Sequence, residues 1–473
     1  MGHRVAIRTA FWPMPGQAPD ARLKSSANRI IAMRMYTLKR TLAGIGVCLM
    51  LAISSVAAGA QEPQAAAVLH PFKGTYELEP GHRISMGVMA EMGNAMAWLD
   101  LKSRKVGLLD AVSDGVFKDH NDQSTMFEFI PAADDTYRAL RIRCAGTVKL
   151  ATRVHPHVRE AVMFRSGNRD LHGDLYLPDA SGPHPVVVFA HGSGPATRGV
   201  GPFTTFFLQK GIGVLTFDKQ GAGQSQGDWE TASFDDLTAD VLAAVVYAKS
   251  RPEVDGLRIG VHGSSQGSWI GAMAAARSSD IAFLMVRVGP GQSVRDTMAR
   301  EKRGQLMVEG VTDSRDLDSA IAMYNAYWEV AARGGTWEQG NAHFIANRDA
   351  PWFKKAFGTP TTTRTPDIER WWTWLGRNLG YDSYDALQSI TVPVFWVLAE
   401  KDWNLDSQAS APRIREALEL AGNTDHTVRV LPDAGHTGLL VKTGLSNEPI
   451  RWQYAPGYWD GMDAWLTAHG IGR

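Results

Sequence analysis

The chain has 473 residues, enough for two or three domains, and 44% of them are hydrophobic, as in soluble proteins with a large core. Its 49 basic and 49 acidic side chains cancel, so no net charge favours nucleic acid or an anionic membrane surface as a partner. The two cysteines, Cys48 and Cys144, are too few for a disulfide framework.

The first segment has the pattern of an export signal. Lys39 and Arg40 precede an uncharged run rich in small and aliphatic residues, which ends in Ala58-Gly-Ala60. A basic start, an apolar centre and a small-x-small exit predict a signal peptide cleaved after Ala60, with residues 1–60 an over-extended start plus signal. A membrane anchor is the alternative, and the many small residues disfavour it. We therefore expect an exported protein, periplasmic or secreted, with no stable membrane insertion after cleavage.

A linker and a β-rich segment come next. Residues 61–70 are rich in Ala, Gln and Pro. In residues 71–157, short stretches of alternating apolar and polar residues are separated by Gly and Asp clusters, which predicts strands with one solvated face. The clearest stretches are 75–79, 97–101, 126–130 and 140–144. We predict a small β-rich N-terminal domain at 71–157.

From Val158 onward, strand and helix patterns alternate. A hairpin is expected at 161–177, and Pro185–Ala190 is a continuous apolar run typical of a strand buried on both faces. Further strands are expected at 213–217, 257–261, 282–288, 392–398 and 426–431, and helices at 204–210, 233–250, 269–277, 315–333, 412–421 and 458–469. The alternation predicts an α/β domain with a doubly wound, mostly parallel sheet over residues 158–473. Residues 290–389 interrupt it and are expected to form a helical lid.

A strand, a sharp turn and a helix meet at Gly263-Ser-Ser-Gln-Gly267. The apolar run Ile259–Val261 precedes the turn, and Ala-rich helix-forming residues follow it. Gly-x-Ser-x-Gly at such a turn is the nucleophile elbow, in which a strained serine is lifted off the sheet edge. This predicts Ser265 as a nucleophile, with the backbone N–H of Gln266 facing any oxyanion formed there. A Gly/Ser-rich loop that matches by chance is the alternative.

A serine nucleophile needs a base and an acid that orients the base. Asp402 and His436 each follow a predicted strand, so both are expected at the sheet edge that carries the elbow. Asp406 is the nearest rival acid, but it lies further from the strand end. His426 precedes its strand, and His469 lies in the terminal helix. The order serine, aspartate, histidine is that of α/β-hydrolases.

The glycine-rich loop His191–Pro195 follows the buried strand at 185–190. Its backbone N–H groups can face the nucleophile. We expect the Ser193 N–H to be the second oxyanion donor beside that of Gln266, with Gly194 as the alternative donor.

With these motifs placed, the chain resembles the α/β-hydrolase superfamily. More narrowly, it resembles secreted or periplasmic bacterial esterases close to the serine-aminopeptidase and prolyl-oligopeptidase-like hydrolases. The motifs that carry the resemblance are 191–195, 217–225, 263–267, 399–402 and 434–436. Two positions depart from it: Gln220 stands where relatives usually have a structural Arg, and Ser264 where they often have His. The resemblance implies acyl-enzyme hydrolysis of a small-molecule ester, amide or thioester, with no metal or organic cofactor.

The expected function is carboxylic-ester hydrolysis by Ser265, His436 and Asp402. An exported serine peptidase or amidase of the same fold is the first alternative, although the sequence reveals no anchor for a substrate amine. A non-catalytic binding protein on a hydrolase scaffold is the second. It is disfavoured because decayed relatives usually lose the serine or the histidine.

Overall fold

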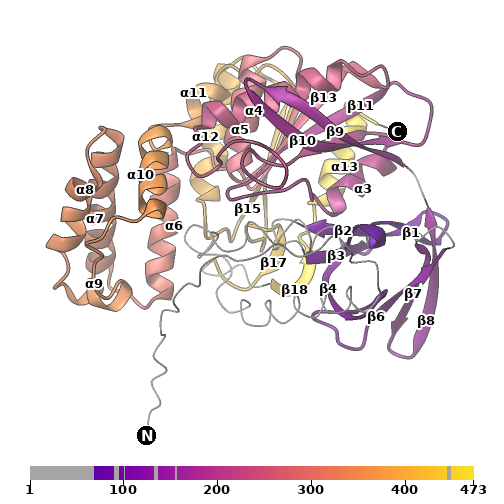
Figure 1. Ribbon diagram of the computed structural model, residues 1–473, viewed down its shortest axis with the longest axis horizontal. Coiled ribbons are helices and arrows are strands. Elements are labelled where there is room, and N and C mark those ends of the chain that lie inside the picture. The colour runs from indigo at the N-terminus through magenta and orange to yellow at the C-terminus, as the bar shows by residue number, and fades with distance from the viewer. Residues whose placement is uncertain are drawn as a thin grey trace, which may run out of the picture.

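A computed structural model describes residues 69–89, 95–100, 102–132, 137–154, 157–444 and 449–472 (Figure 1). The signal peptide expected at 1–60 and most of the linker lie outside the described residues, so cleavage after Ala60 stays a prediction. Among the helices of the described ranges, none is both long and apolar enough to cross a membrane.

An antiparallel sheet forms the N-terminal part of the described chain. After a short 3-10 helix, η2 (His70–Phe72), its strands are β1 (Gly74–Glu79), β2 (His82–Met89), β3 (Ala95–Asp100), β4 (Lys105–Ser113), β5 (Val116–Asp119), β6 (Met126–Pro131), β7 (Tyr137–Cys144) and β8 (Thr147–Val154). Because β4 pairs with both β3 and β5, the order β4-β3-β2-β1-β8-β7-β6-β5 closes on itself. Phe72 lies at the centre of an aromatic core, with its ring 5.0 Å from those of Phe117 and Phe129.

Two strands from the end of the chain extend this N-terminal sheet. β17 (Leu439–Val441) pairs with β18 (Pro449–Tyr454), and Gln453 of β18 pairs with Lys105 of β4. Figure 1 shows this yellow C-terminal hairpin beside the indigo N-terminal strands. The range 158–473, expected from its sequence to be the catalytic domain, thus contributes strands to the N-terminal sheet.

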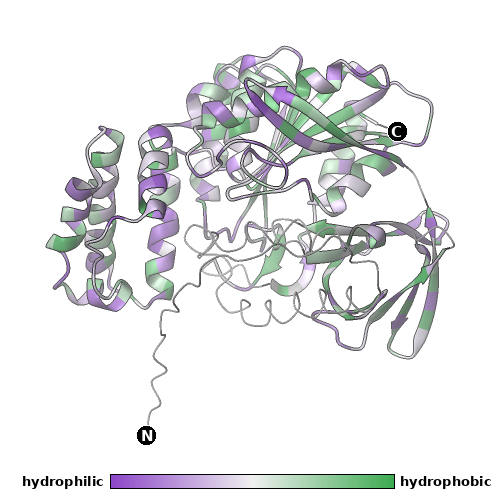
Figure 2. Ribbon diagram, in the orientation of Figure 1, coloured by the Kyte–Doolittle hydropathy of each residue, from purple (hydrophilic) through white to green (hydrophobic). Residues whose placement is uncertain are grey.

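The second sheet has eight strands in the order β16-β15-β14-β13-β11-β12-β10-β9. Their bounds are β9 (His157–Ser166), β10 (Arg169–Pro178), β11 (His184–Ala190), β12 (Gly213–Phe217), β13 (Val254–Ser264), β14 (Phe283–Arg287), β15 (Val394–Ala399) and β16 (His426–Leu431). Neighbours from β16 to β12 are parallel, whereas β10 is antiparallel to β12 and to β9. Figure 2 shows the central strands hydrophobic along their length, as burial on both faces requires. The predicted α/β-hydrolase architecture is confirmed, with a mixed sheet.

Helices from both halves of the catalytic region cover this sheet. They are α3 (Pro202–Gln209), α4 (Phe234–Lys249), α5 (Gln266–Arg277), α12 (Ser407–Leu420) and α13 (Trp459–Ala468). The predicted start of a helix at Pro412 was wrong: the helix begins at Ser407, and Pro412 lies inside it. Asp406 caps this helix by accepting a hydrogen bond from the Ala409 N–H at 3.0 Å.

A helical insertion separates β14 from β15 and stands beside the sheet in Figure 1. Its helices are α6 (Val294–Val308), α7 (Ser314–Ala332), α8 (Trp337–Ala346), α9 (Pro351–Ala356), α10 (Pro366–Asn378) and α11 (Ser383–Leu387). Leu306, Leu317, Met323 and Phe353 are buried in a separate apolar cluster of this insertion. Leu306 belongs to α6, so one face of this helix packs in that cluster. In sequence, α6 is the first helix after β14.

Candidate active site

Ser265 occupies the turn between β13 and α5 in a backbone conformation that residues other than glycine rarely adopt. Its φ of 52° and ψ of −120° lie outside both helix and strand geometry. A Cβ on Gly267 would lie 2.1 Å from the carbonyl oxygen of Ala190, and one on Gly263 would lie 2.5 Å from that of Gly267. Only glycines permit strand and helix to cross this closely. The close crossing and the strained backbone of Ser265 are the two features expected of a nucleophile elbow.

The structure brings Ser265, His436 and Asp402 into one chain of hydrogen bonds. His436 Nδ1 lies 2.7 Å from Asp402 Oδ2, and His436 Nε2 lies 3.0 Å from Ser265 Oγ. A carboxylate can only accept, so Nδ1 carries the proton and Nε2 accepts from the serine hydroxyl. The other Asp402 oxygen accepts from the backbone N–H groups of Asn404 at 2.9 Å and Leu405 at 3.3 Å. The fully buried carboxylate is therefore held in place from both sides.

The rival residues considered from the sequence lie elsewhere. Asp406 caps α12 and pairs with Arg300 at 3.7 Å. His426 lies at the start of β16, the opposite end of the strand from the His436 loop, and its Nδ1 is 2.9 Å from the Asn423 carbonyl. His469 pairs with Asp425 at 2.9 Å. None of these three is hydrogen-bonded to Ser265.

Burial and the neighbouring carboxylates act in opposite directions on the pKa of His436. Burial disfavours the imidazolium, but the Asp402 carboxylate outweighs it and holds the pKa of His436 above its ordinary value. Arg287 lowers this pKa, and Glu301 raises it. A raised pKa suits a base that must keep a proton taken from a serine hydroxyl.

Glu301 of α6 is a charged neighbour that sequence analysis did not single out. Its pKa is raised, chiefly by burial, and it interacts electrostatically with both His436 and Asp402. The same helix packs on the loop after β15: a Cβ on Gly304 would lie 3.5 Å from a ring carbon of Trp403. In sequence, Glu301 stands in a charged run that looks like a solvated helix face, so no local signal marks it.

The loop that follows β11 contacts the elbow. A Cβ on Gly192 would lie 3.6 Å from the Ser265 Cβ, which places the predicted donor Ser193 one residue from that contact. Gln266, the other predicted donor, is the first residue of α5. Its N–H is one of the first four in the helix, which have no acceptor within it.

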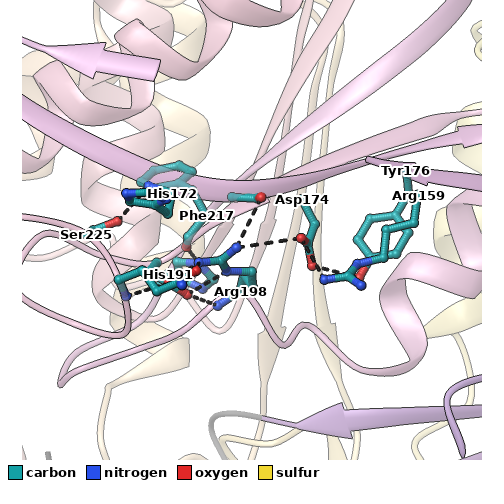
Figure 3. A network of polar contacts seen from close by, with 11 residues as sticks. Arg159, His172, Asp174, Tyr176, His191, Arg198, Phe217 and Ser225 are labelled. Atoms are coloured by element: carbon teal, nitrogen blue, oxygen red, sulfur yellow. Dashed lines mark hydrogen bonds and ion pairs between the residues drawn. The ribbon is translucent and has the colours of Figure 1, made fainter. Parts of the chain in front are cut away.

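Contacts with the end of β12 and with the residue that follows it hold this loop (Figure 3). His191 Nε2 lies 2.6 Å from the Phe217 carbonyl oxygen. Arg198 donates from its backbone at 2.9 Å and from Nε at 3.0 Å to Asp218. Arg198 also reaches Asp174 at 3.6 Å. The sequence motif at 217–225 thus supports the loop that carries Ser193.

The departure at Gln220 has a structural counterpart. Gln220 is buried, and its Nε2 donates to Asp240 Oδ2 at 2.9 Å. Arg169 of β10 donates to the other oxygen of Asp240 at 3.0 Å. The guanidinium that binds the Asp240 carboxylate is therefore that of Arg169 on β10, and not that of an arginine at position 220.

Comparison with known proteins gives a family match that lies within residues 158–473. The sequence model of the serine aminopeptidase family, S33, matches residues 181–440. A thiohydrolase of Aspergillus aculeatus, aneE, is 29% identical over 210 residues, which cover 41% of this chain and 64% of that protein. Esterase EstD of Thermotoga maritima is 30% identical over 136 residues, covering 27% of this chain and 32% of that protein. The chain therefore spans less than two thirds of the length of either relative.

Among solved structures, the esterase Pf2001 of Pyrococcus furiosus aligns with a TM-score of 0.40 at 17% identity, covering 66% of this chain and 91% of that one. DcsB in complex with its substrate analogue aligns with a TM-score of 0.42 at 18% identity, covering 67% of this chain and all of that one. The family match to residues 181–440 covers more than half of the chain. The chain accordingly belongs to the serine aminopeptidase (S33) family of the α/β-hydrolase superfamily.

Proposed function

We propose that this hydrolase cleaves a carboxylic ester of a small molecule through an acyl-enzyme on Ser265. The observation that carries the proposal is the unbroken chain from the Ser265 hydroxyl through His436 to Asp402, at 3.0 Å and 2.7 Å. A serine positioned in this way on a strained turn has a base within reach of its hydroxyl.

The mechanism follows from these positions. Ser265 Oγ attacks the acyl carbonyl while His436 Nε2 takes its proton, and Asp402 holds the tautomer and stabilises the imidazolium. His436 then protonates the departing alcohol, and water repeats the sequence on the acyl-enzyme. The N–H groups of Gln266 and Ser193 are the proposed donors to the oxyanion.

The test is hydrolysis of a chromogenic short-chain ester by the purified protein and by Ser265→Ala. We expect the variant to lose at least about 10³-fold in kcat, with an unchanged fold by circular dichroism. Turnover equal to that of the parent protein would remove Ser265 from the mechanism.

A serine aminopeptidase or amidase is the second candidate. The family match supports it, and so does Glu301, an acidic group whose charge reaches His436. An acid near the nucleophile can hold a substrate ammonium. Aminoacyl nitroanilides assayed beside acyl esters separate the two: a kcat/KM that favours the anilides and falls in Glu301→Gln would replace the ester proposal.

We also propose that the protein is exported after cleavage behind Ala60 and that the helical insertion acts as a lid over the site. The basic, apolar and small-x-small pattern before residue 61 supports export. The packing of α6 against the loop that holds Asp402 supports a lid. Mass spectrometry of the protein recovered from a bacterial periplasm tests export: the expected first residue is Gln61, and an uncleaved chain would contradict it.

A further inference from the structure

We propose that Lys219 is a positioning residue for the oxyanion hole, because its ammonium binds the peptide group that carries the Ser193 N–H and also binds the side chain of Gln266. This inference rests on the proposed function, since an oxyanion forms only if Ser265 attacks a carbonyl.

Two hydrogen bonds carry the assignment. Lys219 lies in the segment after β12 and is 5% exposed. Its Nζ donates to the carbonyl oxygen of Gly192, and it donates to Oε1 of Gln266 at 3.2 Å. A lysine ammonium has three donors and no acceptor, so it can make both bonds at once. One side chain thus bridges the loop after β11 to the first residue of α5.

The bond to Gly192 sets the direction of the neighbouring N–H. The Gly192–Ser193 peptide is planar, and the only cis peptide in the described part of the chain is Gly182–Pro183. In a trans peptide the C=O and N–H point in opposite directions. With the Gly192 oxygen held by Lys219, the Ser193 N–H points away from the Lys219 ammonium.

Within the described residues, the Ser193 N–H donates to no backbone carbonyl. A Cβ on Gly192 would lie 3.6 Å from the Ser265 Cβ, so this peptide runs beside the nucleophile. The Gly194 N–H, the alternative donor, belongs to the next peptide, whereas the Lys219 bond to the Gly192 oxygen acts on the peptide that carries the Ser193 N–H. The contacts of Lys219 therefore favour Ser193 as the donor.

Other hydrogen bonds hold the rest of the loop, so loss of the Lys219 ammonium should change the structure only near Gly192. The backbone N–H of Lys219 donates to the Ala196 carbonyl at 3.0 Å, a bond that any substitution at 219 keeps. His191 and Arg198 are tied to Phe217 and Asp218. Removing the ammonium frees one peptide group to rotate while both ends of the loop stay anchored.

The test is Lys219→Met, which keeps the length and apolar stem but removes the donors. We expect kcat for the chromogenic ester to fall about 10- to 100-fold, less than for deletion of an oxyanion donor, with KM changed by less than about threefold. The affinity for a trifluoromethyl ketone, which forms an oxyanion on the serine, should fall by the same factor as kcat/KM. A role in folding alone would lower thermal stability without this parallel loss.

The matched control is Lys355→Met. Lys355 also donates its Nζ to a backbone carbonyl, that of Gly310 in the helical insertion, and it should keep the parent kcat. A second variant, Lys219→Ala, leaves room for a small amine, so ethylammonium should restore part of its kcat in a saturable way. The same amine should not help Lys219→Met, whose side chain fills the space.

The outcomes separate the two proposals. If Ser265→Ala is inactive but Lys219→Met keeps its kcat, or if ketone affinity is unchanged while kcat falls, the assignment of Lys219 is wrong. If Lys219→Met does not fold, failure of ethylammonium to raise kcat in a folded Lys219→Ala overturns it. If Ser265→Ala remains active, the proposed function itself fails.

Discussion

Gly267 is the position where the smallest change should do the largest damage. An added Cβ would meet two backbone oxygens, at 2.1 Å from Ala190 and 2.7 Å from His191. Ala190 is the last residue of β11, and His191 begins the loop that carries Ser193. Since neither oxygen can rotate away, α5 and that loop must move apart by roughly 1 Å to reach ordinary contact distance.

Gly267→Ala should therefore lower both stability and activity. Overpacking of this kind costs about 1–3 kcal/mol, which urea unfolding would measure. A displacement of roughly 1 Å between the nucleophile and its oxyanion donors is expected to lower kcat about 10²-fold. Hydrolysis of a chromogenic short-chain ester gives kcat and KM at once.

Gly271→Ala is the matched control, one turn further along the same helix. Its Cβ would come closest to two methyl groups, at 3.2 Å on Val261 and 3.3 Å on Leu284, and those side chains can adjust; the nearest backbone atom, the Gly263 Cα, would be at an ordinary 3.8 Å. We expect stability within about 1 kcal/mol of the parent protein, because alanine is the better helix former. The reasoning is refuted if Gly267→Ala keeps the parent kcat, or if Gly271→Ala loses as much.

Four further changes, two of them controls, test the electrostatics of the site. Glu301→Gln should lower the pKa of His436, and because the base must be neutral, the acid limb of kcat/KM should move to lower pH. The same change at Glu309, at the far end of α6, should leave that limb in place. Asp402→Asn should lower kcat about 10⁴-fold with little change in KM, since the tautomer of His436 is no longer fixed. Asp406→Asn should retain most activity, because asparagine caps a helix as well as aspartate does. An unshifted pH profile, or equal losses at 402 and 406, would count against the site.

The α/β sheet and the candidate site in residues 158–473 could be predicted because short sequence patterns mark their strands and turns. The strand at 185–190 is buried on both faces, and the turn at 263–267 is marked by two glycines that the crossing requires. Parallel strands bring their carboxyl ends to one edge, so the loops after β13, β15 and β16 had to meet there. The position of Asp402 beside His436 follows from that topology.

What the sequence did not reveal depends on contacts between distant segments. The pairing of Gln453 with Lys105 joins residues far apart in the chain and leaves no periodic trace in either strand. Pro412 looked like a helix start, yet capping by Asp406 begins the helix earlier. Lys219 stood inside a recognised motif, but only folding shows that its ammonium reaches Gly192.

The central claim is that Ser265 is a nucleophile activated by His436. The most direct measurement is reaction with a fluorophosphonate, followed by intact mass and peptide mapping. The account predicts a single adduct on Ser265, no adduct in Ser265→Ala and much slower labelling in His436→Ala. An unlabelled parent protein, or an adduct that persists in Ser265→Ala, would contradict it.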